Sequence, residues 1–254
     1  MSQSPTRQNF SLGRLFLPAG IRRRFELERY HVCEFVRREA IPAFHSGMQV
    51  LDAGSGRLKE QVMREELLAS GATLHTLDFC AGPGVDFVGD VSDLPFKDAS
   101  YDAVICTQVL EHVKSPPKTV SELVRVLKPG GMLYLTAPQS APLHNLPWHF
   151  FNPTKLGMQM LLEDLGMELV TIKPQGGHFS QLATVLHFTV PVLQQSSLPK
   201  IVKFPAELAA RFLFGFVAKL VLIPLDRFDT QCKNAGGWCF AARKPQHSSS
   251  TPSS

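Results

Sequence analysis

The segment 89–131 alternates apolar runs, turns and a helix in a fixed order, and this alternation most constrains the fold. Asp90 follows a short apolar run at 85–88, and a Leu-Pro-Phe turn leads to a second apolar run at 101–106. A helix-forming stretch then ends at Lys-Pro-Gly-Gly, 128–131, which is predicted to be a tight turn. Alternating strand and helix signals predict right-handed crossovers and a parallel sheet.

The same alternation extends over most of the chain. Strands are expected at 49–52, 73–77, 85–88, 102–106, 132–137, 168–172 and 237–243. Helices are expected at 21–40, 58–69, 116–126 and 154–165. The segment 80–84, Cys-Ala-Gly-Pro-Gly, is too rich in glycine and proline for a helix, so a loop is expected there.

A chain of 254 residues suits one α/β domain with an appendage. The expected organisation is a flexible N-terminus, a core with an N-terminal cap helix, an apolar helical insertion, a closing strand of the core and a disordered tail. These five parts are assigned to residues 1–20, 21–174, 175–235, 236–245 and 246–254.

The insertion contains an unusually apolar stretch, 207–225, whose polar residues Glu207, Arg211 and Lys219 form one narrow stripe. Two cations and a proline make it a poor spanning helix, since a central charge costs roughly 2.5–3.5 kcal/mol on insertion scales. Three interpretations stay open: a helix buried against the core, a lid over an apolar substrate, and an element in a membrane interface.

Charge and cysteine content limit the compartment and the partners. The net charge is +4, and arginines crowd the segment 22–38, which is either a solvated helix face or a contact for lipid headgroups, a phosphorylated substrate or RNA. Five cysteines without a CxxC pattern argue against a disulfide framework or a structural zinc site. The first thirty residues lack the apolar core of a signal peptide, so a reducing, cytoplasmic location is expected.

A glycine turn follows the first predicted strand. Gly54 and Gly56 lack a Cβ, so the chain can turn tightly and bring backbone N–H groups against a ligand. Asp78 ends the second predicted strand, where a carboxylate can accept both hydroxyls of a ribose. A nicotinamide-dependent dehydrogenase shares these two features, but the sequence from Gly54, GSGRLK, lacks the GxGxxG fingerprint.

The strings DAGSG, LPF, LEHV and RVLKPGG resemble the nucleotide-binding core of the class I S-adenosylmethionine-dependent methyltransferases, in particular the small-molecule "methyltransferase type 11"-like group. The resemblance covers 50–166 and is compatible with a closing strand at 237–243. It implies a Rossmann-like, doubly wound α/β fold with a mostly parallel seven-stranded sheet. The last strand is antiparallel and follows the helical insertion. The cofactor implied is S-adenosyl-L-methionine.

The resemblance also implies a cofactor-binding set at the carboxyl ends of the strands. Asp52 meets the ammonium, Asp78 the ribose, Asp90 the adenine amine, and Gln108 lies beside the sulfonium. The full set is Asp52, Gly54, Ser55, Gly56, Asp78, Phe79, Asp90, Val91 and Gln108. Leu58 stands where the family's glycine loop commonly has a third glycine.

Three histidines, His112, His144 and His149, are the candidate catalytic residues. His112 is a candidate general base because the ordinary pKa of histidine lies near neutrality, and a structural histidine bonded to backbone is the alternative. The string at 144–152, HNLPWHFFN, resembles an HxxPxDFFR string of bacterial methyltransferases associated with glycan or lipid modification, with His149 and Asn152 in place of Asp and Arg. No metal site is expected, because these histidines and the acids lack ligand spacing.

The implied activity is SN2 transfer of a methyl group to a small acceptor of the lipid-linked or glycan type. If the stretch 207–225 is the element in a membrane interface, peripheral membrane association accompanies this activity. A non-catalytic S-adenosylmethionine-binding scaffold is the first alternative. An RNA methyltransferase is the second, disfavoured by the modest charge and the lack of an appended RNA-binding module.

Overall fold

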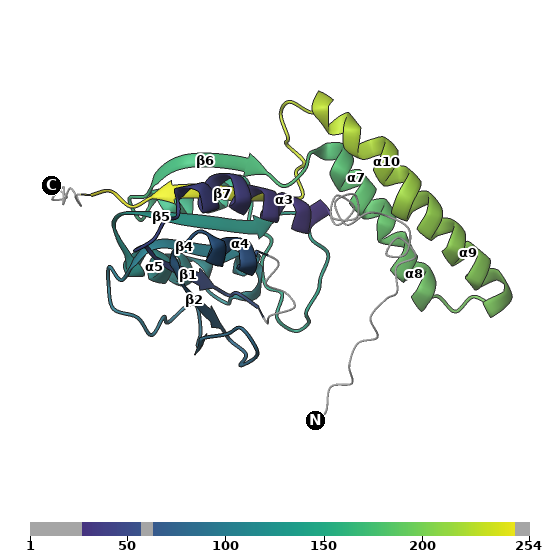
Figure 1. Cartoon of the computed structure of the whole chain (residues 1–254). Coiled ribbons are helices and arrows are strands. Elements are labelled where there is room, and N and C mark those ends of the chain that lie inside the picture. The colour runs from purple at the N-terminus through teal and green to yellow at the C-terminus, as the bar shows by residue number, and fades with distance from the viewer. Residues whose placement is uncertain (1–26, 57–62, 247–254) are drawn as a thin grey trace.

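A computed structural model of the chain describes residues 27–56 and 63–246. Its centre is a seven-stranded sheet of order β3-β2-β1-β4-β5-β7-β6 (Figure 1). The strands are β1 Gln49–Ala53, β2 Thr73–Asp78, β3 Phe87–Val88, β4 Tyr101–Thr107, β5 Leu127–Pro138, β6 Glu168–Pro174 and β7 Gly237–Arg243. Neighbours from β3 to β5 pair parallel, whereas β7 pairs antiparallel with both β5 and β6. The predicted fold class is confirmed.

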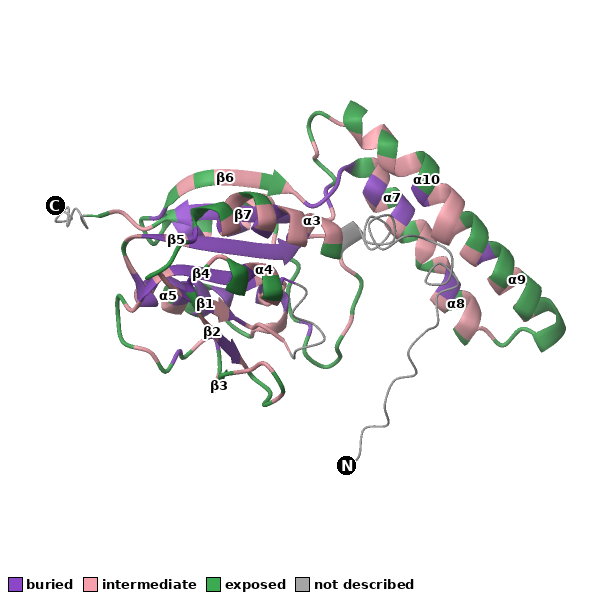
Figure 2. Ribbon diagram, viewed as in Figure 1, coloured by how far each residue is buried: buried purple, intermediate pink, exposed green. Residues whose placement is uncertain are grey.

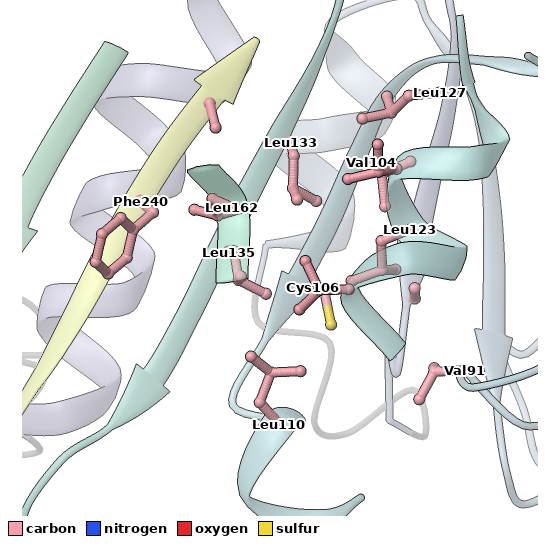
Figure 3. Packing of buried hydrophobic residues seen from close by; sticks show 14 of the residues in the cluster. Val91, Val104, Cys106, Leu110, Leu123, Leu127, Leu133, Leu135, Leu162 and Phe240 are labelled. Atoms are coloured by element: carbon pink, nitrogen blue, oxygen red, sulfur yellow. The ribbon is translucent and has the colours of Figure 1, made fainter. Parts of the chain in front are cut away.

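Helices cover both faces of the sheet because the strand side chains alternate between two apolar faces. The helices are α3 Leu27–Phe35, continued by a π-helical turn Val36–Ala40, then α4 Arg64–Ala69, α5 Pro116–Val126 and α6 Lys155–Glu163. Residues of α5 and α6 pack with Val104 and Leu133 on one face (Figure 3), and residues of α3 and α4 pack with Ile105 on the other. The segment 80–84 is a loop, as predicted.

The predicted turn at 128–131 is instead part of β5. The pairing of β4 with β5 jumps from Tyr101–Leu127 to Ala103–Met132, so the extra residues bulge out of the ladder. Gly130 has a φ of +80° and donates its N–H to the Lys244 carbonyl. The segment therefore pairs with the strand end beside it, which local turn signals do not predict.

Several predicted features lie outside the described residues. They are 1–26, including the arginines at 22–24 and the start of the cap helix, then 57–62 with Leu58, and 247–254. The described part of the cap helix, 27–40, is helical as predicted, and the 3₁₀ turn Ile41–Ala43 follows it at Pro42. The helix predicted at 58–69 is described from Arg64 onwards.

The insertion folds into a helical arm, residues 178–228, that projects from the sheet (Figure 1). Its first half is α7 His178–His187 and α8 Thr189–Gln195. Its second half is a continuous helical segment, Lys200–Phe228, built from α9 Lys200–Phe212, a π-helical turn Leu213–Val217, α10 Ala218–Leu222 and a 3₁₀ turn Ile223–Phe228. By length and composition alone this segment is long and apolar enough to cross a membrane, and only 11% of its most apolar window is buried. The interpretation as a helix buried against the core is therefore wrong.

Two aspartates tie the two ends of the arm together. The Asp226 carboxylate accepts N–H groups of Gly177, Phe179 and Ser180 at 2.9–3.1 Å, in the first turn of α7. The Asp229 carboxylate accepts the N–H of His178 at 2.8 Å, and this bond lowers the pKa of Asp229 from its ordinary value. Both aspartates therefore satisfy N–H groups that lack an intrahelical partner.

Candidate active site

A cavity of about 400 Å³ opens at the carboxyl ends of β1 and β4. The chain leaves β1 toward β2 on one side of the sheet and leaves β4 toward β5 on the other, so this is the switch point where ligands bind in open parallel sheets. The lining residues that matter below come from the glycine turn, from the cap helix and from the loops after β4 and β5. They are Arg29, Cys33, Asp52, Gly54, Ser55, Gly56, Arg64, Gln108, Glu111, His112, His144 and Asn145.

Close packing determines the shape of the glycine turn. Gly54 has a φ of +80°, and a Cβ there would lie 2.3 Å from Cγ2 of Val109. The N–H groups of Gly54 and Ser55 both donate to the carbonyl of Leu77, at 2.7 and 3.0 Å. The N–H of Gly56 donates to Oδ2 of Asp78 at 2.9 Å. The turn after β1 is thus bonded to the end of β2, and only glycine fits at its first bend.

Asp52 contributes an unusual carboxyl group to the cavity. Burial raises the pKa of Asp52 from its ordinary value of 3.8 to about 7, with a further rise from nearby Asp78 that the Arg64 guanidinium opposes. Near neutral pH the group therefore gains or loses its proton readily. A cation bound in the cavity would favour the carboxylate.

The other residues expected to bind the nucleoside lie beside this cavity at the ends of β2 and β3. Asp78 pairs with Val88 across the strands, and its Oδ1 accepts the N–H of Cys80 at 2.9 Å. Asp90 is exposed, and its Oδ1 accepts the N–H of Ser92. The structure brings Asp78 and Asp90 to one edge of the sheet, as predicted, but neither lines the cavity itself.

The neighbours of these acids differ in exposure. The ring of Phe79 is largely exposed and lies 6.4 Å from the ring of Trp148, centroid to centroid. The side chain of Val91 packs in the core, so its backbone is the part that a ligand can reach.

Gln108 occupies a sterically restricted backbone conformation at the end of β4. Its φ is +54°, a region uncommon for residues other than glycine and found at functional sites. Its N–H donates to the Thr136 carbonyl, and its Oε1 accepts from Oγ1 of Thr136. Its amide also lies 3.4 Å from the amide of Gln175, which is buried at the end of β6. These bonds hold Gln108 over the cavity.

The three candidate histidines converge. Their ring centroids are 4.9 Å apart for His112 and His144, 4.5 Å for His144 and His149, and 5.8 Å for His112 and His149. His112 follows β4, whereas the other two follow β5. The loop after β5 is bonded to the loop after β4, because the N–H of Phe150 donates to the Glu111 carbonyl at 2.8 Å.

The histidines differ in what their ring nitrogens do. Nδ1 of His149 accepts the N–H of His144 at 3.2 Å, and its Nε2 lies 3.1 Å from Oδ1 of Asn152. This pattern fits the tautomer with hydrogen on Nε2, and the two bonds brace the loop. Nδ1 of His112 and Nδ1 of His144 each contact a backbone carbonyl, of Trp148 and Pro142. Those two rings line the cavity and remain the acid–base candidates.

Sequence reasoning missed several cavity residues. Glu111 is buried, and its Oε1 lies 3.8 Å from Nε2 of His112. Glu111 is the glutamate of the LEHV string, but the sequence predicted no role for it. Arg29 and Cys33 come from the cap helix and Arg64 from α4. No local signal marks these three, because only the packing of the helices on the sheet brings them to the cavity.

The sheet order, the switch-point cavity and the glycine turn define a Rossmann-like domain of the class I methyltransferase type. Residues 52–135 match the family model described as methyltransferase domain, so this segment is similar to that family. Within the described residues none of the five cysteines forms a disulfide bond.

Two curated relatives and one solved structure show the range of the similarity. The chain is 37% identical over 97 residues to the demethylmenaquinone methyltransferase of Renibacterium salmoninarum, covering 34% of this chain and 40% of that protein. It is 37% identical over 123 residues to the ubiquinone biosynthesis O-methyltransferase of Xanthomonas axonopodis pv. citri, covering 43% and 49%. The chain thus spans less than half the length of these relatives. The [4+2]-cyclase SpnF shares the fold, with a TM-score of 0.53 and 18% identity over 85% of this chain and 80% of that one.

Proposed function

We propose that this protein transfers the methyl group of S-adenosyl-L-methionine to a small apolar acceptor of the quinone or lipid-linked kind. One observation carries the proposal: the glycine turn, Asp52 and two histidines line a single cavity at the switch point of the sheet. The methyl donor and the histidines that accept a proton would therefore lie in the same cavity. The relatives named above are methyltransferases of demethylmenaquinone and of ubiquinone biosynthesis, which supports the acceptor class.

The donor lies along the carboxyl ends of β1, β2 and β3. The described bonds of Asp78 use one position on each carboxylate oxygen, and each oxygen accepts about two, so it can also accept from ribose hydroxyls. The exposed Asp90 and Phe79 take the adenine. The amino-acid end enters the cavity, where its ammonium meets Asp52 and favours the charged carboxylate.

The chemistry is a displacement at the activated methyl group. A lone pair of the acceptor oxygen forms the new C–O bond, and the C–S bond breaks with its electron pair on sulfur. The hydroxyl proton passes to His112 or His144. Alignment of the two reactants and exclusion of water supply most of the rate increase, since the cofactor itself provides the leaving group.

We propose that the helical arm lies in the interface of an anionic bilayer on the cytoplasmic side and brings the protein to its acceptor. Ile201, Phe204, Leu208 and Phe212 recur at three- and four-residue intervals, and all are exposed. The same segment carries more cations than acids, which suits anionic headgroups. The cations that are not buried are Lys200, Lys203, Arg211 and Arg227, against the acids Glu207 and Asp226; Lys219 is buried.

Vesicle flotation tests the arm. The protein is expected to float with vesicles containing phosphatidylglycerol and to lose this binding on Leu208→Glu. Leu156→Glu is the matched control, because Leu156 is an exposed leucine of α6 on the core. No flotation of the wild type would favour a lid over the substrate, and resistance to alkaline extraction would favour a spanning helix.

Calorimetric titration with S-adenosylmethionine tests the cofactor site. Wild type is expected to bind with micromolar affinity, Asp78→Ala to weaken binding at least tenfold, and Asp164→Ala, an exposed aspartate at the end of α6, to leave it unchanged. No binding by folded wild type would overturn the proposal. Binding without turnover on quinol, phenolic and glycan acceptors would support a non-catalytic scaffold.

A further inference from the structure

We propose that Glu111, His112 and His144 hold a divalent transition-metal ion in the floor of the cavity. One ligand atom from each residue lies within 4.8 Å of the ligand atoms of the other two. A carboxylate with two imidazoles is a donor set for zinc and for iron of the non-haem type. Sequence spacing gave no sign of it, because Glu111 and His112 follow β4 and His144 follows β5.

The three ligand atoms need to move only slightly to reach metal-bonding distance. Three atoms that all lie within 4.8 Å of one another have a common centre no more than about 2.8 Å from each (4.8 divided by √3). Zinc bonds to nitrogen and carboxylate oxygen are about 2.0–2.2 Å long. Each ligand atom therefore needs to move inward by roughly 0.7 Å at most, which side-chain rotation can supply.

The surroundings orient both imidazoles as metal-binding histidines are usually oriented. Nδ1 of His112 lies against the Trp148 carbonyl and Nδ1 of His144 against the Pro142 carbonyl. In the neutral rings hydrogen therefore sits on Nδ1 and the lone pair on Nε2, the tautomer in which Nε2 binds a metal. His149 adds a second layer of support, since it accepts the N–H of His144.

The metal's role rests on the proposed function, although its binding does not. A divalent ion lowers the pKa of a hydroxyl bound to it, so a phenolic or enolic acceptor loses its proton to solvent without a histidine base. The oxygen lone pair then forms the C–O bond as the C–S bond breaks. The proposal narrows the acceptor to a molecule with such a hydroxyl, and His112 and His144 become ligands in place of bases.

Titration of the untagged, chelator-treated full chain with Co²⁺ tests the site. We expect one ion per chain, visible in the cobalt d–d spectrum. Glu111→Gln and His144→Asn are each expected to weaken binding by about 10- to 100-fold. His45→Asn is the matched control, because His45 is an exposed histidine before β1 and outside the cavity.

Three results would overturn the proposal: no binding by wild type, unchanged binding by His144→Asn, or a sulfur-to-cobalt charge-transfer band, which would assign the ion to Cys33. If Glu111→Gln does not fold, His144→Asn alone decides. Titration of metal-free wild type with S-adenosylmethionine separates the two proposals. Cofactor binding without cobalt binding would contradict only the proposed metal site. Cobalt binding without cofactor binding would contradict the proposed function and leave the metal site standing.

Discussion

The central strands and the helical arm use apolar residues in opposite ways. In β5 the side chain of Leu133 is fully buried, and in β7 so is that of Phe240, whereas in α9 Ile201 is 84% exposed and Phe204 72% exposed. Figure 2 shows β5 and β7 mostly in the colour of buried residues and α9 mostly in the colours of exposed and intermediate ones. Burying such a side chain contributes roughly 1.5–3 kcal/mol. Burial of its apolar side chains therefore stabilises the sheet. The exposed apolar side chains of the arm contribute little to the free energy of unfolding. Apolar content alone does not show which segments stabilise a fold.

Matched truncations should show the largest difference between the two regions. Leu133→Ala is expected to lower the free energy of unfolding by about 2–5 kcal/mol, because it leaves a cavity in the core. Ile201→Ala is expected to change it by less than about 0.5 kcal/mol. Urea unfolding followed by circular dichroism measures both. Equal losses would mean that the outer face of the arm is packed in solution.

A pair of glycines sharpens the comparison within the core. Gly54 and Gly47 both have positive φ, but a Cβ on Gly47 meets nothing within 4 Å. Gly54→Ala is expected to cost about 1–3 kcal/mol more than Gly47→Ala, because only Gly54 is crowded by Val109. Unfolding titrations measure this difference, and cofactor titration should show weaker binding for Gly54→Ala alone. Similar behaviour of the two variants would contradict the crowding at the turn.

A substitution at the junction between core and arm should destabilise only the start of the arm. Asp226→Asn removes the charge that accepts three N–H groups of the arm's first turn, at a cost of about 1 kcal/mol. Hydrogen exchange at Phe179 and Ser180 is expected to accelerate while β4 is unchanged. Asp164→Asn serves as the control. Faster exchange throughout the sheet would show that arm and core unfold as one unit.

Replacing Asp52 should change the stability of the protein only as the pH rises. Its pKa in the folded protein, about 7, lies above its ordinary value of 3.8, so the unfolded chain loses this proton first. Between about pH 4 and pH 7 this group therefore lowers stability as pH increases. Asp52→Asn is expected to match the wild type near pH 4 and to be more stable at pH 8, by thermal unfolding. A constant difference across this range would contradict the raised pKa.

Much of the core could be predicted from the sequence because its signals are local. Strand runs, the glycine turn at Gly54 and the acid at Asp78 each follow from residue type and order. The bulge in β5 was missed because it depends on pairing with β4 and is accompanied by the bond from Gly130 to Lys244, more than a hundred residues away.

The cavity could be predicted only in part. Asp52 and Gln108 follow strands, so their positions come from topology. The approach of His144 to Glu111 depends on the path of the loop after β5, and Cys33 arrives with a packed helix. The arm shows the same limit, since a sequence pattern predicts an apolar helix but not what covers it.

The clamp formed by Asp226 and Asp229 makes the arm a separable module. Because Gly177 and Asp226 are joined by a hydrogen bond, the chain enters and leaves the arm at nearly the same point. A short linker of a few residues could replace 178–228 while costing little closure entropy and leaving β6 and β7 in register. The arm can therefore be grafted onto another core or exchanged for another insertion without rebuilding the sheet.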